Sequence, residues 1–197
     1  MLIVSVDTSL NKFAAVIWRD GVPVTHRLFR TGKDKTKKKL KSVKYFDNLA
    51  EQINWLSNEV IDFIKLHGKP NKVYLEGLSF GSSGNASRDL ASIYALFVDK
   101  LHEKVGMAFC DIEAIPPTTI KAVARTFLPL EEQTEINAKG KQVKRVISKD
   151  LMITVAEDLH SEILEGLVKS AASEHSGKED MSDAILCYYA GEKRTTN

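Results

Sequence analysis

The chain has 197 residues, of which 43% are hydrophobic, so it can bury one sizeable core, and this composition argues against disorder of the whole chain. Its formal net charge of +2, from 28 basic and 26 acidic residues, argues against a protein that coats nucleic acid by uniform positive charge. The positive charge is local, because seven lysines and a single acid, Asp34, lie between Lys33 and Lys44. We expect one domain over residues 1–197, with two domains as the alternative.

The two cysteines, Cys110 and Cys187, lie in apolar stretches, and neither forms a C-x-x-C pair. This usage argues against a disulfide framework or a zinc site, and we expect two buried free thiols in a reducing cytosol. No apolar stretch approaches the length of a membrane span. The first residues lack a basic leader, and Asp7 interrupts their apolar run, so we expect a strand there rather than a signal peptide.

Three short strands are predicted at the start of the chain. Apolar, β-branched runs cover residues 2–6 and 13–18, and an alternating pattern follows over 22–29 after a turn at Asp20. Two close turns between short strands are typical of an antiparallel meander. The polar, lysine-rich segment 31–44 is then predicted to be a basic loop.

A helical period replaces the strand pattern after this loop. Apolar residues recur at helical spacing from Tyr45 to Ile64, and the Gly-Lys-Pro sequence at 68–70 ends the predicted helix. A short strand over 72–75 follows and is directly succeeded by Glu76. The helix between the third and fourth strands permits a parallel crossover connection.

The second half of the chain continues to alternate. The Gly/Ser-rich residues 77–84 are predicted to be a flexible loop, followed by a helix over 87–103 and a strand over 107–115. A short helix over 118–127 has prolines near its first turn. Residues 129–148 are polar and lack an apolar period, so we expect a loop or a mobile insertion.

Two more helices, over about 151–159 and 181–192, complete the predicted elements. Strands followed by alternating strands and helices are typical of the α/β class. We therefore predict a mixed five-stranded sheet, with its first three strands antiparallel and with helices on its faces.

Four acidic residues occur where predicted elements begin or end. Asp7 and Glu76 each follow an apolar strand, and parallel neighbouring strands would bring them to the same edge of the sheet. Asp180 and Asp183 are three residues apart near the start of the last helix, so they share one helix face. Taken singly, each acid has an ordinary explanation as a turn residue, a solvated strand end or a helix-dipole acid. Their joint placement at element boundaries is harder to explain in that way.

Converging carboxylates would repel one another, and divalent cations would relieve this repulsion. Oxygen ligands suit Mg²⁺, with Mn²⁺ as a substitute. Two such ions, about 3.5–4 Å apart, can activate the attacking water and stabilise the leaving 3′ oxygen of a phosphodiester. The four acids therefore predict metal-dependent phosphodiester hydrolysis, in which Asp7 bridges both ions, Glu76 and Asp183 bind one each, and Asp180 binds or orients.

Three blocks carry a family resemblance: IVSVDTSLNKFAAVIW at 3–18, a block beginning VYLEGLSF at 73–103, and DMSDAILCYYAGE at 180–192. Weaker similarity covers 115–127 and 148–159. These blocks resemble the RuvC family of Holliday junction resolvases, particularly its phage-type members. The resemblance implies an RNase H-like fold, a homodimer and paired symmetric nicks across four-way junctions and related branched DNA. It also implies a cytoplasmic location, in a bacterial cell or a phage-infected host.

By position in the resemblance, the metal-binding and catalytic carboxylates are Asp7, Glu76, Asp180 and Asp183. The resemblance also implies a DNA-binding set. Phe80 would stack on bases near the crossover, and Lys121 and Lys149 would lie near the scissile phosphate, with Arg125 on the same predicted helix face as Lys121. Within the basic loop, the candidate phosphate contacts are Lys37, Lys38 and Lys39. A solvated, flexible loop explains this lysine run equally well.

Two other functions remain open at this point. One is a DNA-structure-binding protein of the same fold without catalysis, although such a binder has no need of four repelling acids. The other is an actin-like ATP-binding protein, suggested by the VDTS sequence that ends at Ser9. That fold needs a second, similar half with its own phosphate loop, which this sequence does not contain. In the resembled family a helix in the region of 87–103 contributes to the dimer, and a two-fold dimer would match the symmetry of a junction.

Overall fold

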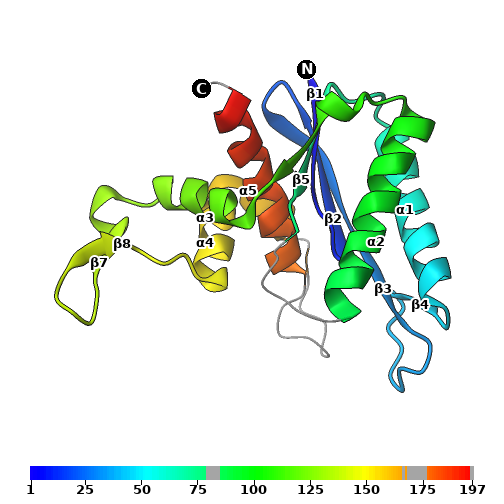
Figure 1. Ribbon diagram of the computed structural model, residues 1–197, viewed down its shortest axis with the longest axis horizontal. Coiled ribbons are helices and arrows are strands. Elements are labelled where there is room, and N and C mark those ends of the chain that lie inside the picture. The colour runs from blue at the N-terminus through cyan, green and yellow to red at the C-terminus, as the bar shows by residue number, and fades with distance from the viewer. Residues whose placement is uncertain (79–84, 166, 168–176, 196–197) are drawn as a thin grey trace.

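The computed structural model describes residues 1–78, 85–165, 167 and 177–195. Its main feature is a six-stranded mixed sheet with helices on both faces (Figure 1). The strands are β1 Leu2–Asp7, β2 Lys12–Arg19, β3 Val22–Lys33, β4 Lys44–Phe46, β5 Lys72–Glu76 and β6 Ile112–Ile115. The helices are α1 Leu49–Lys65, α2 Asn85–Lys100, α3 Pro117–Thr126, α4 Lys149–Leu164 and α5 Lys178–Thr195.

The sheet has the order β4-β3-β2-β1-β5-β6. The first three strands pair antiparallel, whereas β5 is parallel to β1 and β6 is parallel to β5. The predicted mixed sheet is therefore confirmed, with all five predicted strands present. A sixth strand, β4, pairs parallel with the end of β3.

The segment around β4 differs from its prediction. The helix was expected to begin at Tyr45, which is wrong, because Tyr45 pairs with Gly32 in β4. Helix α1 begins only at Leu49, where the Asn48 side chain caps it by accepting hydrogen bonds from the backbone N–H groups of Ala50 and Glu51. The aromatic ring of Tyr45 thus belongs to the sheet edge and not to the helix period.

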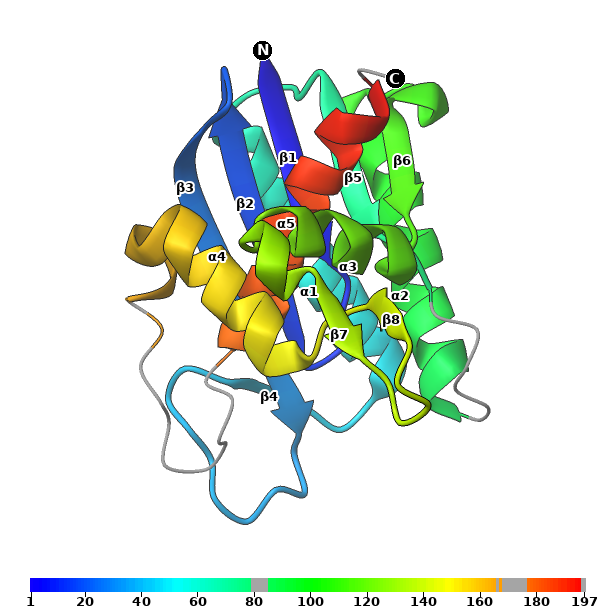
Figure 2. The ribbon, with the colours of Figure 1, turned by 90° about the vertical axis from the view of Figure 1, so that its left-hand side faces the viewer.

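Two apolar clusters lie on the two faces of the sheet. Because side chains alternate along a strand, Val4 and Val6 pack with α1 and α2, whereas Ile3 packs on the opposite side with α3, α4 and α5. Figure 2 shows α3, α4 and α5 together in front of the sheet. This alternation decides which face each strand-end acid can reach.

The predicted insertion 129–148 contains ordered structure. A short 3₁₀ turn, Leu130–Glu132, leads into an antiparallel hairpin of β7 Thr134–Ile136 and β8 Gln142–Lys144. The hairpin projects from the body of the molecule beyond α3 and α4 (Figure 1). The segment was expected to be a loop or a mobile insertion, and the loop prediction is wrong because the segment contains a hairpin.

Further sequence predictions concern individual side chains and helices. Cys187 is buried as expected, but Cys110 is exposed, so its predicted burial is wrong. Cys110 lies in a 3₁₀ turn, Phe109–Asp111, that precedes β6, and its apolar sequence neighbours do not make it part of the core. Trp18 is fully buried, and its indole N–H donates to Ser5 Oγ at 2.8 Å. Among the described residues, no helix has both the length and the apolar character needed to cross a membrane.

Candidate active site

Asp7 and Glu76 are brought together by the pairing of two parallel strands. Strand β1 pairs with β5 so that Val6 lies opposite Leu75, and the next residue of each strand is an acid. Both acids follow a residue that packs toward α1 and α2, so both point to the opposite face, which α5 covers. Strand register and side-chain alternation thus place the two carboxylates on one side of one sheet edge.

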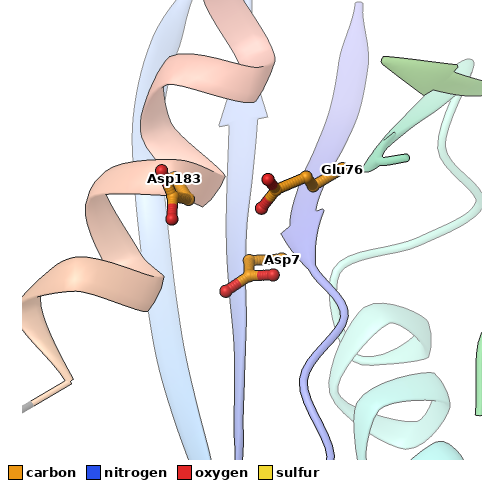
Figure 3. A group of neighbouring side chains, drawn as sticks. All are labelled: Asp7, Glu76 and Asp183. Atoms are coloured by element: carbon orange, nitrogen blue, oxygen red, sulfur yellow. The ribbon is translucent and has the colours of Figure 1, made fainter. Parts of the chain in front are cut away.

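Helix α5 supplies the third carboxylate. It packs against β1, β2 and β5, and its first turns carry Asp180 and Asp183. Carboxylate oxygens of Asp7, Glu76 and Asp183 all lie within 4.8 Å of one another. Figure 3 shows the three side chains pointing toward a common space from two strands and a helix.

The carboxylates are held where their ionised forms are unfavourable. Burial raises the pKa of Asp7 well above its usual range, and the charges of Glu76, Asp183 and Asp180 raise it further. Burial also raises the pKa of Asp183 to about 8, with Glu76 as the largest neighbouring contribution. Burial raises the pKa of Glu76 as well, although a hydrogen bond from Asp7 and the charge of Lys121 oppose this. Without a cation, the site therefore keeps protons on some of these acids.

The donor set fits a hard divalent cation. Three carboxylates converge on one point, and magnesium and manganese are ions that prefer such oxygen ligands. A bound cation would replace the retained protons and remove the mutual repulsion that raises these pKa values. Asp7, Glu76 and Asp183 are the residues that could hold it.

Asp180 belongs to the same electrostatic environment but has a different partner. Its carboxylate lies 3.9 Å from the ammonium nitrogen of Lys12. Burial raises the pKa of Asp180, and Lys12 is the largest opposing influence. Asp180 thus lies beside the three converging acids, and the ammonium group of Lys12 partly balances its charge.

A cleft of about 300 Å³ opens beside the carboxylates. Glu76 and Asp183 line it together with two predicted DNA-binding residues, Lys121 of α3 and Lys149 of α4. Lys149 forms an ion pair with Glu179, which also lines the cleft. The structure therefore brings two lysines, 28 positions apart in the numbering, to the same opening as the acids. A phosphate in this cleft would meet the positive charge of the two lysines close to the carboxylates.

The remaining predicted DNA-binding residues lie elsewhere. Arg125 does not line this cleft, because its Nε donates to the backbone carbonyl of Arg145 at 2.8 Å and so ties α3 to the hairpin segment. Lys39 in the loop between β3 and β4 pairs with Asp34 and lies 5.5 Å from the ring centre of Tyr45. Lys37 and Lys38 are exposed in the same loop. Phe80 lies outside the described residues.

Several charged side chains near Asp180 were not predicted from the sequence. Lys12 and Arg30 both lower the pKa of Asp180, and Glu179 pairs with Lys149. A signal existed for Lys12: it stands two residues before Ala14, which packs on the α5 face of the sheet, so alternation points Lys12 toward the acids. The same signal existed for Arg30, which stands two residues after Leu28 of the α5 face and lies opposite Lys12 in the sheet.

The architecture and the paired strand-end acids define an RNase H-like fold. Two solved structures share it over their full length: T. thermophilus RuvC in complex with a Holliday junction substrate, and Thermus thermophilus RuvC. The first has a TM-score of 0.62 and 10% sequence identity, covering 100% of this chain and 97% of that chain. The second has a TM-score of 0.58 and 10% identity, covering 100% and 98%. No family model and no curated protein matches the sequence. At this identity the similarity establishes the fold.

Proposed function

We propose that this protein is a magnesium-dependent endodeoxyribonuclease of the RuvC family that resolves Holliday junctions and related branched DNA by paired symmetric nicks. The convergence of Asp7, Glu76 and Asp183 within 4.8 Å, beside a lysine-lined cleft, carries the proposal. Support for a branched substrate comes from the shared fold with a RuvC structure solved on a Holliday junction substrate.

In the proposed site, the acidic residues would bind the metal ions and the lysines would position the phosphate. Asp7, Glu76 and Asp183 would hold two Mg²⁺ ions, with Mn²⁺ as a substitute, and these ions supply an activated water and stabilise the leaving oxygen. Lys121 and Lys149, which line the same cleft, would orient the scissile phosphate. Asp180, next to Lys12, would adjust the charge balance around the first three acids or bind an ion itself.

The test is strand scission on three labelled substrates: a four-way junction, a three-way junction and a linear duplex, each with and without Mg²⁺. We expect Mg²⁺-dependent nicks at symmetric positions of the four-way junction and little cutting of the duplex. Equal cutting of all three substrates would contradict the proposed selectivity for branched DNA. An absence of Mg²⁺-dependent scission would contradict the proposed nuclease activity.

The alternative is a DNA-structure-binding protein of the same fold without catalysis. Such a protein would bind the junction in the same assay and leave every strand intact. The buried, mutually repelling acids favour the nuclease, because burying them costs folding stability that a pure binder has no reason to bear.

A further inference from the structure

The β7–β8 hairpin is a projecting arm with an uneven charge distribution. Residues 136–149 contain five basic side chains and no acidic one. Lys139, Lys141 and Lys144 are exposed on the hairpin, and Lys149 leads directly from it into the cleft. Glu135 precedes this stretch and Glu132 pairs with Arg145, but the cationic side chains outnumber these acids, as is typical of a surface that contacts phosphates.

The hairpin has a defined shape, so its lysines are held in position. The Asn137 side chain accepts hydrogen bonds from the backbone N–H groups of Lys139 and Lys141, at 2.9 and 3.0 Å, and thereby orders the tip. Gly140 takes a positive φ of 70°, which closes the turn. On the strands, Gln142 donates to Thr134 at 2.9 Å across the pair.

The base of the hairpin is fastened to a helix that lines the cleft. Arg125 of α3 donates to the carbonyl of Arg145, and Arg145 in turn pairs with Glu132 at 3.0 Å. The Gln133 side chain donates to the Leu128 carbonyl just beyond α3. The hairpin is therefore attached to the scaffold that positions Lys121, and its direction relative to the cleft is fixed by these bonds.

We propose that the β7–β8 hairpin binds the phosphate backbone of one duplex arm of the substrate, outside the catalytic cleft. This inference rests on the proposed function and assigns a second DNA contact to the same enzyme. A two-stranded ribbon has the width that a duplex major groove admits, and Lys139, Lys141 and Lys144 would meet the phosphates that flank it. Such contacts orient the DNA and extend the bound length without reading its sequence.

The length of the arm predicts how far the contact extends. Lys149 at the cleft is eight residues from Lys141 near the tip, and eight residues span at most about 26 Å at about 3.3 Å per residue. Duplex DNA rises by about 3.4 Å per base pair, so the tip reaches at most about eight base pairs from the cleft. Protection of one arm should therefore extend to about that distance from the nicked position.

The experiment compares the wild-type protein with the triple variant Lys139→Gln/Lys141→Gln/Lys144→Gln. Hydroxyl-radical footprinting on a four-way junction in Ca²⁺ reports the extent of protection, and titrations at several salt concentrations report the number of phosphate contacts. We expect the variant to lose the distal protection and the slope of log affinity against log salt to fall by about 2–3. Affinity at about 0.1 M salt should fall roughly 10- to 100-fold. Scission at saturating protein should persist, because the carboxylates are unchanged.

A matched control is Lys65→Gln/Lys69→Gln/Lys104→Gln, which removes the same charge from exposed positions near the C-terminal ends of α1 and α2, the helices on the other face of the sheet. It should keep the footprint and lose little of the salt slope.

The hairpin proposal is overturned if the hairpin variant keeps the wild-type footprint and salt slope. It is equally overturned if the control variant loses as much protection and salt slope as the hairpin variant. It is also overturned if the hairpin variant changes only self-association, because its exposed Ile136 and Val146 would then serve a protein contact. If wild-type protein binds no branched DNA, the proposed function fails, and the hairpin inference fails with it.

Discussion

Asp7 is the acid with the most repulsive surroundings among the three converging carboxylates. It is half-buried, and the charges of Glu76, Asp183 and Asp180 all disfavour its ionised form. We expect Asp7→Asn to lower Mg²⁺-dependent scission by more than about 100-fold, because a metal ligand is lost. In EDTA the variant should melt at a higher temperature than wild type, because one half-buried acid is removed. Mg²⁺ should then add little to its melting temperature.

Differential scanning fluorimetry in EDTA and in Mg²⁺ measures both parts of this prediction. Asp158→Asn, at an exposed position on α4, is the control and should leave both melting temperatures and scission unchanged. Asp7→Asn protein that still nicks junctions in Mg²⁺ would refute the assignment of Asp7. Retained junction binding without scission would support it.

The raised pKa of Asp183, about 8, predicts how the stability of the metal-free protein depends on pH. The folded state keeps a proton that the unfolded chain releases near its ordinary pKa of about 4. The stability that this retained proton contributes to the folded state is therefore fully present below about pH 4 and is lost as pH rises toward about 8. We expect the melting temperature in EDTA to fall across this range, and saturating Mg²⁺ to restore most of the loss at the alkaline end.

Thermal unfolding at a series of pH values, with EDTA or Mg²⁺, checks this sign. Asp183→Asn should make the metal-free profile less steep, since one of the groups with a raised pKa is gone. A metal-free melting temperature that rises steadily from about pH 5 to pH 8 would contradict the raised pKa.

For single residues, the sequence predicted those members of the site whose positions follow from a local strand pattern. Asp7 and Glu76 could be found because each ends an apolar strand, and alternation then selects their face. Cys110 was misplaced because apolar sequence neighbours do not reveal that a 3₁₀ turn exposes it. Lys12 and Arg30 could have been found in the same way, because alternation places both on the α5 face, where they lie opposite each other on β2 and β3.

Among the elements, α5 must lie very close to β5 for its acids to reach the strand ends. Gly191 makes this approach possible, because a Cβ at that position would lie 2.5 Å from ring atoms of the fully buried Tyr74. Gly191→Ala should improve helix propensity by about 1 kcal/mol but introduce overpacking of about 1–3 kcal/mol. We expect a net loss of up to about 2 kcal/mol in the free energy of unfolding, together with weaker Mg²⁺ binding.

Urea unfolding of Gly191→Ala, Tyr74→Leu and the double variant measures this clash as a coupling between the two positions. The double variant should be less destabilised than the sum of the single variants, because the smaller side chain makes room for the methyl group. Strict additivity would show that α5 can shift away from the sheet without cost.

The elements that the sequence failed to predict bury little apolar surface. The β7–β8 hairpin leaves Ile136 exposed, so no apolar period marks its strands. Strand β4 has only three residues and pairs along one edge, so its sequence could not be distinguished from the start of a helix. The strands and helices that were predicted are those whose apolar residues fill the two clusters on the sheet.

In the whole molecule, the two faces of the sheet carry different features. Helices α1 and α2 cover one face, whereas α3, α4, α5 and the hairpin lie on the other (Figures 1 and 2). The outward side of α2 has small exposed residues, Ala91, Ser92 and Ala95, which would let a second copy approach closely. The family resemblance implies a homodimer with a helix of this region at its interface, so we expect a second copy to contact this side of α2.

Ala95→Arg tests this interface, because a large charged side chain would hold two α2 helices apart without touching the buried core. Light scattering coupled to size exclusion should report a dimer for wild type and a monomer for the variant, with an unchanged melting temperature. Ala108→Arg, exposed just before the 3₁₀ turn, is the control and should remain dimeric.

The same variant also tests whether the two nicks are coupled. On a supercoiled plasmid with an extruded cruciform, the dimer should yield linear DNA from two coupled nicks. The monomer should yield mainly nicked circles, because a single active site cannot cut both strands in one binding event. Linear product from monomeric Ala95→Arg protein would separate paired nicking from this interface, and a dimeric variant would place the interface on another surface.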